Sequence, residues 1–151
     1  MKTLPWIAAL ALAAVPAAAL AHVTATPPVA ETGAYTQTAF RVGHGCEGGL
    51  ATTALRIAIP AGLDQARPRP VPGWTIAIEK APDGKTTAVS WKGRLADSEF
   101  QVFELLYRAP DKAGPLTFAV VQTCGAKHAD WSPVVQVGAA TPAADPHAGH
   151  H

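Results

Sequence analysis

Sulfur-containing side chains are scarce in this sequence of 151 residues. Met1 is the only methionine, and Cys46 and Cys124 are the only cysteines. In an exported protein, two distant cysteines without a C-x-x-C spacing favour a disulfide over a pair of thiolate metal ligands. With the cysteines bridged and Met1 lost with a cleaved leader, no soft sulfur ligand would remain. Any metal site would therefore be built from nitrogen and oxygen donors.

Charge is low and balanced, and long apolar runs are missing. Lys2 is one of 12 Lys and Arg residues, so without it 11 basic residues face 11 acidic ones. Binding to nucleic acid or to anionic lipid needs a basic surface, so neither partner is expected. The apolar stretch 7–20 is too short and too rich in alanine for a membrane span. No span is expected in the mature chain.

The first residues have the pattern of a secretory signal. Lys2 precedes the apolar stretch 7–20, which ends in the A-x-A cleavage pattern of Ala19-Leu20-Ala21. We expect cleavage after Ala21, which gives a signal peptide at 1–21, a folded domain at 22–138 and a flexible His-rich tail at 139–151. The product is expected in the periplasm or outside the cell.

Alternation of apolar and polar residues predicts strands throughout the domain, and no stretch shows a sustained helical period with caps. Pro60, Pro68, Pro70 and Pro72 indicate a stiff, extended connection, and 125–130 is expected to be a loop. Seven or eight short strands with turns between them predict an all-β, antiparallel β-sandwich of immunoglobulin-like or cupredoxin-like type. The expected strands are 23–26, 35–42, 52–60, 74–79, 86–91, 100–108, 116–123 and 131–137.

Cleavage after Ala21 would make His22 the first residue of the mature protein. A terminal histidine carries a free α-amine beside its own imidazole Nδ1, and these two nitrogens can chelate one metal ion. Nitrogen donors in a planar arrangement suit Cu(II). The alternative is that a histidine follows the cleavage site by chance.

The end of the chain is also rich in histidine. His147, His150 and His151 follow a segment of alanine and proline. This composition is typical of metal capture, with low affinity at each site. An expression tag is the alternative explanation, although tags usually contain uninterrupted histidines.

Several motifs, in this order, resemble the YcnI-like family of exported bacterial copper-binding proteins. The resemblance implies a β-sandwich in which the mature N-terminal histidine binds Cu(II) through its amine and imidazole. In that family this single-histidine brace is completed by an acidic side chain and lies near a tryptophan, and His22 and Trp131 stand at the matching positions. The motifs are His22-Val23-Thr24, Phe40-Arg41-Val42 with His44-Gly45-Cys46, Pro72-Gly73-Trp74, and Val120-Val121-Gln122-Thr123-Cys124 followed by Trp131.

One position departs from the family pattern. The family has an F-[DE]-E-F-like stretch, and this chain has Val102 where the glutamate is expected. By strand parity Glu104 faces the same side as Val102, so Glu104 is the first candidate for the missing oxygen ligand. Glu99 and Asp130 are the other candidates.

Two further histidines and one tryptophan, Trp131, admit two interpretations each. His44 is either a second copper ligand or, as we favour, a loop residue hydrogen-bonded beside the disulfide. His128 is interpreted in the same way, with a role in the outer shell of the metal as its alternative. Trp131 either packs in the sandwich or shields the copper, whereas Trp74 and Trp91 are expected in the core.

The sequence therefore predicts an exported Cu(II)-binding protein that captures, buffers or transfers copper and is not an enzyme. Its expected partners are the copper ion and a periplasmic Cu(I) chaperone or copper importer. One alternative is a copper oxidase or monooxygenase-like enzyme, which generally needs a second histidine on the metal and an open substrate face. The other is a metal-free envelope β-sandwich module.

Overall fold

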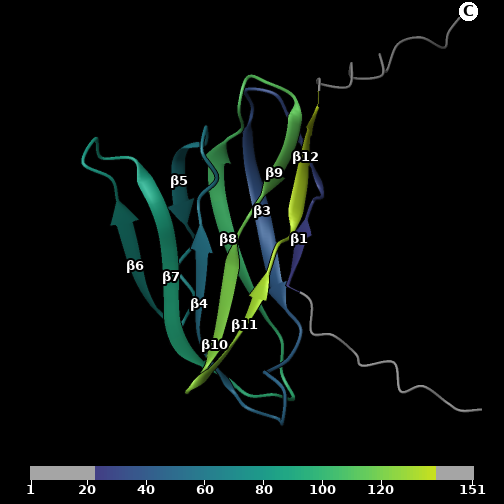
Figure 1. Cartoon of the computed structure of the whole chain (residues 1–151), viewed down its shortest axis with the longest axis vertical. Helices are drawn as coiled ribbons and strands as arrows, with labels where there is room; N and C mark the ends of the chain where they lie inside the picture. The colour runs from purple at the N-terminus through teal and green to yellow at the C-terminus, as the bar shows by residue number, and fades with distance from the viewer. Residues whose placement is uncertain (1–22, 139–151) are drawn as a thin grey trace, which may run out of the picture.

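The computed structural model describes residues 23–138, and within this range the chain forms twelve strands and no helix (Figure 1). None of the described residues belongs to a helix that could cross a membrane. The strands are β1 (Thr24–Thr26), β2 (Val29–Glu31), β3 (Tyr35–Val42), β4 (Thr52–Ala58), β5 (Asp64–Pro68), β6 (Thr75–Lys80), β7 (Thr86–Leu95), β8 (Gln101–Arg108), β9 (Gly114–Thr117), β10 (Val120–Cys124), β11 (Lys127–Trp131) and β12 (Val134–Gly138).

The strands form three hydrogen-bonded sheets. A four-stranded sheet has the order β1-β3-β8-β5, and a five-stranded sheet has the order β11-β10-β4-β7-β6. The third sheet, β2-β12-β9, contains the single parallel pair of the described residues, β2 with β12. All other paired strands run antiparallel, so the expected all-β, antiparallel class is confirmed.

The pairing of β3 with β8 shows how alternation separates core from surface. Phe40 faces Phe103 in this pair, and both side chains are fully buried. The next pair toward the end of β3, Arg41 and Val102, points to the opposite face because successive side chains alternate along a strand. One buried cluster collects the inward side chains of both large sheets, which is the arrangement of a sandwich.

Aromatic side chains fill the middle of this core. Trp91 lies 5.3 Å from Phe103, and Trp74 packs edge-on against Phe103 at 4.9 Å between ring centroids. Trp91 is fully buried and Trp74 partly so, as expected for core residues. Such rings supply much of the apolar burial that stabilises a sandwich.

The strand predictions were wrong in five places, the first being the short strand β2, which was not expected. The proline-rich connection contains β5, which pairs with β8, and the expected loop 125–130 contains most of β11. The expected strands 116–123 and 131–137 are each split in two. In both cases the chain leaves one sheet for another, at 118–119 and 132–133 respectively, so no continuous strand is formed. Periodicity does not reveal a change of sheet, because apolar alternation continues on both sides of it.

The two ends of the sandwich carry different parts of the chain. Thr24 pairs with Arg41, so β1 begins beside the end of β3 and the loop 43–51 that follows it. Gly138 pairs with Glu31, beside the turn that leads to the start of β3. The first and last described residues therefore lie at opposite ends (Figure 1). We call the end with loop 43–51 the disulfide end.

Candidate functional site at the disulfide end

The disulfide joins the loop after β3 to the end of β10. Cys46 and Cys124 are bonded, with their α-carbons 6.0 Å apart, and no free cysteine remains among the described residues. The predicted disulfide is therefore confirmed. It connects the four-stranded sheet, through its loop, to the five-stranded sheet.

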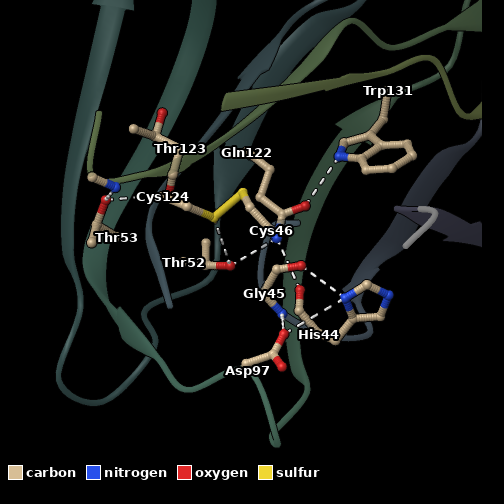
Figure 2. Close-up of a disulfide and its surroundings, with 11 residues drawn as sticks. His44, Gly45, Cys46, Thr52, Thr53, Asp97, Gln122, Thr123, Cys124 and Trp131 are labelled. Carbon is tan, nitrogen blue, oxygen red and sulfur yellow. Dashed lines mark hydrogen bonds and ion pairs between the residues drawn. A yellow bond between two sulfur atoms is a disulfide. The ribbon is translucent and has the colours of Figure 1, made fainter. Parts of the chain in front are cut away.

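A buried amide organises the residues around the disulfide. Gln122 is 1% exposed, and its Nε2 donates to the backbone oxygen of His44 at 2.9 Å and to Thr52 Oγ1 at 2.7 Å. Its Oε1 accepts a hydrogen bond from Trp131 Nε1 at 3.1 Å. Figure 2 shows Gln122 between the disulfide and Trp131, with His44 on the same side as the indole. Both donors and the acceptor of this amide are therefore satisfied.

Thr52 extends this network to the disulfide. Its hydroxyl lies 3.8 Å from Cys124 Sγ, and it is the donor because a disulfide sulfur carries no hydrogen. Among the described residues, no buried side-chain nitrogen or oxygen is left without a hydrogen-bond partner. The polar cluster is thus fully satisfied, which is the condition under which buried polar groups hold a structure in one arrangement.

The backbone of loop 43–51 is held at two further points. Asp97 Oδ1 accepts a hydrogen bond from the Gly45 amide at 3.1 Å, and Cys46 and Leu50 exchange backbone hydrogen bonds. A Cβ at Gly45 would collide with the backbone oxygen of Leu50, so this close approach requires glycine. The imidazole of His44 projects from this fixed loop with 40% of its side chain exposed.

The start of β1 lies beside this loop. Val23 is buried. Because Thr24 pairs with Arg41, the residue before it, Val23, falls opposite Val42, which lies two residues before His44. His22, the predicted copper ligand, lies outside the described residues, as do the signal peptide at 1–21 and the tail histidines His147, His150 and His151.

The predicted third ligand, Glu104, is placed on the outer face of the four-stranded sheet. Its Oε1 accepts a hydrogen bond from Gln37 Nε2 at 2.7 Å, and its Oε2 pairs with the guanidinium of Arg69. Hydrogen bonds from Arg69 and then Gln37 lower the pKa of this carboxyl, against an opposing effect of desolvation. Glu104 pairs with Ala39, two residue pairs farther from the disulfide end than the pair of Val102 with Arg41. Both of its carboxylate oxygens already have a partner.

The other predicted oxygen donors are dispersed. Glu99 accepts a hydrogen bond from the Ala96 amide at 3.3 Å, and Asp130 lies 3.8 Å from His128 Nε2 on β11. Among residues 23–138, no three His, Cys, Asp or Glu side chains gather closely enough to hold a metal ion.

Two residues of the cluster were missed at the sequence level. Gln122 had a usable signal, because it lies between Val120 and Cys124 on the inward face of a predicted strand, where a polar residue is unusual. Asp97 had no such signal in the sequence, because only folding brings it from a separate loop to the backbone of Gly45.

A sequence profile described as a domain of unknown function, DUF1775, matches residues 22–148. This chain is a member of the DUF1775 family. The match begins at His22, the residue after the predicted cleavage site. Copper-binding protein CutI of Bacillus subtilis is 30% identical to this DUF1775 chain over 100 residues, which supports the YcnI-like resemblance. The matched region covers 64% of this chain but about half of CutI, 48%.

Solved structures confirm the fold of the DUF1775 domain. An uncharacterized protein from Nocardia farcinica with an immunoglobulin-like fold superposes with a TM-score of 0.65 at 24% identity, covering 77% of this chain and 97% of that one. A type I cohesin from Pseudobacteroides cellulosolvens superposes with a TM-score of 0.52 at 12% identity, covering 86% and 97%. These similarities establish an immunoglobulin-like sandwich and carry no statement about function.

Proposed function

We propose that this protein is an exported Cu(II)-binding protein of the periplasm or cell exterior. In this proposal, cleavage after Ala21 exposes His22, whose α-amine and imidazole Nδ1 bind copper together. CutI, its relative, carries the name of a copper-binding protein, which supports the choice of metal. Nitrogen donors and the lack of a free sulfur ligand among the described residues favour the oxidised ion.

The observation that carries this proposal is the buried position of Val23 at the disulfide end. Val23 is 5% exposed and belongs to the core cluster, so the chain is anchored immediately after His22. Consecutive α-carbons are 3.8 Å apart, which keeps the backbone of His22 close to this anchor. In this proposal, the terminal nitrogens of His22 bind copper near the end of the sandwich that carries the loop of His44 and Asp97.

The proposed ligands predict how copper binding depends on pH. The α-amine has an ordinary pKa of about 7.7–8.0 and imidazole one of about 6.5. Copper must displace protons from both nitrogens, so affinity should fall as the pH drops through this range. An oxygen ligand alone would lose affinity only near pH 4.

We propose that the bound copper is captured, buffered or transferred rather than used in catalysis. The tail histidines would add weak sites that raise the local supply of copper. A periplasmic Cu(I) chaperone or a copper importer is the proposed recipient, because the mature chain offers no sulfur ligand for the reduced ion.

The test is a Cu(II) titration of two proteins that differ by one residue. The first begins at His22 and ends at residue 138, and the second retains Ala21 ahead of His22. We expect calorimetry to show one tight site in the first protein and its loss in the second, because the added peptide bond removes the α-amine. Equal binding by the two proteins would contradict the brace. N-terminal sequencing of the secreted protein checks that natural cleavage occurs after Ala21.

A further inference from the structure

We propose that two copies of this chain associate through the outer edge of β6, so that their five-stranded sheets join into one continuous sheet. The proposal concerns residues 75–80 and is independent of the proposed copper site. It follows from an unpaired strand edge, an exposed isoleucine beside it and a sequence that complements itself.

The outer edge of β6 has no strand paired to it within residues 23–138. β6 is the last strand in the order β11-β10-β4-β7-β6, and the described residues offer 75–80 no backbone partner outside β7. Figure 1 shows β6 at the margin of the molecule, with β7 on its inner side. An edge strand presents a row of unpaired N–H and C=O groups, so β6 can accept another strand.

The other sheet edges carry features that oppose such pairing. β1 and β2 have three residues each and are separated by two prolines, and β9 has four residues that include a proline. β5 contains Pro68 and pairs irregularly with β8, and three of the five β11 residues are Lys, His or Asp. Short strands, prolines, bulges and charges are the usual protection of an edge. β6 has six residues, no proline and a regular register from Thr75 to Glu79.

The inward side chains of β6 leave an apolar residue uncovered at this edge. Ile76 and Ile78 pair with Trp91 and Val89, which are fully buried, so both isoleucines face the core side of the sheet. Ile76 packs against the core cluster, whereas Ile78 is 46% exposed. The opposite sheet therefore does not cover Ile78, and a strand added to β6 would bring a side chain next to it.

A second β6 is the strand that fits this edge. Residues paired across antiparallel strands point to the same face, so a two-fold axis must pass through a pair of equivalent residues. With the axis at Ala77, Ile76 of each copy faces Ile78 of the other. With the axis at Ile78, Ile76 would face Lys80, and with the axis at Glu79 two carboxylates would face each other, which is destabilising. The apolar pairs therefore select the axis at Ala77.

The charge of Glu79 does not oppose this register. Its two carboxylate oxygens accept hydrogen bonds from Arg56 Nε at 2.8 Å and Nη2 at 2.7 Å. In the register centred on Ala77, Glu79 faces the neutral Thr75 of the second copy. No like charges are placed opposite each other along this edge.

Cysteine cross-linking tests the register. The two Ala77 α-carbons would lie about 4.5–5.5 Å apart, which is within the range of a disulfide. The two α-carbons of residue 78 would lie about 8 Å apart, which is too far. We expect Ala77→Cys in the secreted protein, oxidised with EDTA present, to form a covalent dimer at least about tenfold faster than Ile78→Cys. Non-reducing gels measure both rates.

Val134→Cys is the matched control for chance collisions. Val134 is 45% exposed, close to the 46% of Ile78, but lies on β12 in a different sheet. Equal rates for the variants at residues 77 and 134 would overturn the proposal. Faster cross-linking at residue 78 than at residue 77 would overturn the register on which the proposal depends.

Sedimentation of the unmodified protein in EDTA measures the association without a bridging metal. Two six-residue strands bury less than the roughly 1,200 Å² of a standard interface, so we expect a weak, reversible dimer at high protein concentration. Ile78→Lys should raise its dissociation constant at least about tenfold, because the lysine would face Ile76 of the second copy. Val134→Lys should leave the dissociation constant unchanged. A parent protein that stays monomeric at every concentration would overturn the dimer without affecting the proposed copper site.

Discussion

Single residues at the disulfide end are important because of the groups with which they form hydrogen bonds. Gln122 is the clearest example, because one amide serves the indole of Trp131, the hydroxyl of Thr52 and the backbone of His44. A buried amide of this kind contributes little net energy when satisfied, yet leaving its partners unsatisfied is costly. Its importance therefore lies in where it places its partners.

Replacing this amide should reveal that cost. We expect Gln122→Met to lower the free energy of unfolding by about 1–3 kcal/mol, because Trp131 Nε1 and the His44 oxygen lose a buried partner. Urea denaturation measures the change. The indole N–H resonance of Trp131 should also shift, since its acceptor is removed. Gln136→Met, at an exposed position on β12, is the matched control and should change stability little.

Glu104 shows the opposite case, a charged pair on an open face. Its carboxyl has a lowered pKa because Arg69 and Gln37 donate to it. The pair therefore stabilises the fold above the pKa of the unfolded chain, about 4.3, and the contribution is lost as the pH falls through the lower pKa of the folded state.

The substitution Glu104→Gln tests this sign. At pH 7 we expect a loss of about 0.2–1 kcal/mol, as is usual for exposed pairs. The difference from the parent should close as the pH falls below 4, because the parent is then protonated as well. Denaturation curves at pH 7 and pH 3 give both values. Glu47→Gln, in the exposed part of loop 43–51, controls for the removal of one negative charge. A difference that grows in acid would refute the linkage.

At the scale of elements, the disulfide connects parts that strand pairing leaves separate. Loop 43–51 extends from β3 of one sheet, and Cys124 ends β10 of the other. The bonded cysteines are 78 residues apart, so the crosslink restricts a long segment of the unfolded chain. It also fixes the loop that carries His44.

Removing this crosslink should therefore affect stability strongly. We expect the double variant Cys46→Ser, Cys124→Ser to lose about 2–4 kcal/mol of unfolding free energy, measured by urea denaturation. The parent protein kept in a reducing agent should unfold at a similar urea concentration. A variant as stable as the oxidised parent would show that strand pairing alone holds the loop.

At the scale of the whole molecule, the first and last described residues lie at different ends of the sandwich. Val23 lies at the disulfide end, and Gly138 lies at the other, next to the turn before β3. Residues 22 and 139 are therefore joined to the described domain at different ends. We expect the proposed site at His22 and the proposed tail sites to bind copper independently.

Independence of the sites can be measured directly. We expect removal of residues 139–151 to abolish weak Cu(II) binding while leaving the affinity of the tight site unchanged within about twofold, because uncoupled sites do not share free energy. Calorimetry of the full mature chain and of the shortened one gives both values. Alanine at His147, His150 and His151 in the full chain is the control for loss of the tail itself. A weakened tight site would show that the tail contributes to it.

Local properties of the chain determined most of what could be predicted. Alternation along β3 and β8 indicated strands with one buried face, and two cysteines in a chain expected to be exported indicated a disulfide. His22 became a candidate ligand because a cleavage pattern precedes it, and a signal peptidase recognises the residues next to the bond that it cuts. Each of these inferences depends only on residues close together in the sequence.

Tertiary structure alone decided how distant residues share one site. It split two expected strands between sheets, moved Asp97 to the backbone of Gly45, and engaged both oxygens of Glu104 with other side chains. It also placed the imidazole of His44 on the crosslinked loop, with Nδ1 2.8 Å from the backbone oxygen of Gly45. The physical reason is that a side chain's availability depends on its partners in space, and those partners come from strands that only folding brings together.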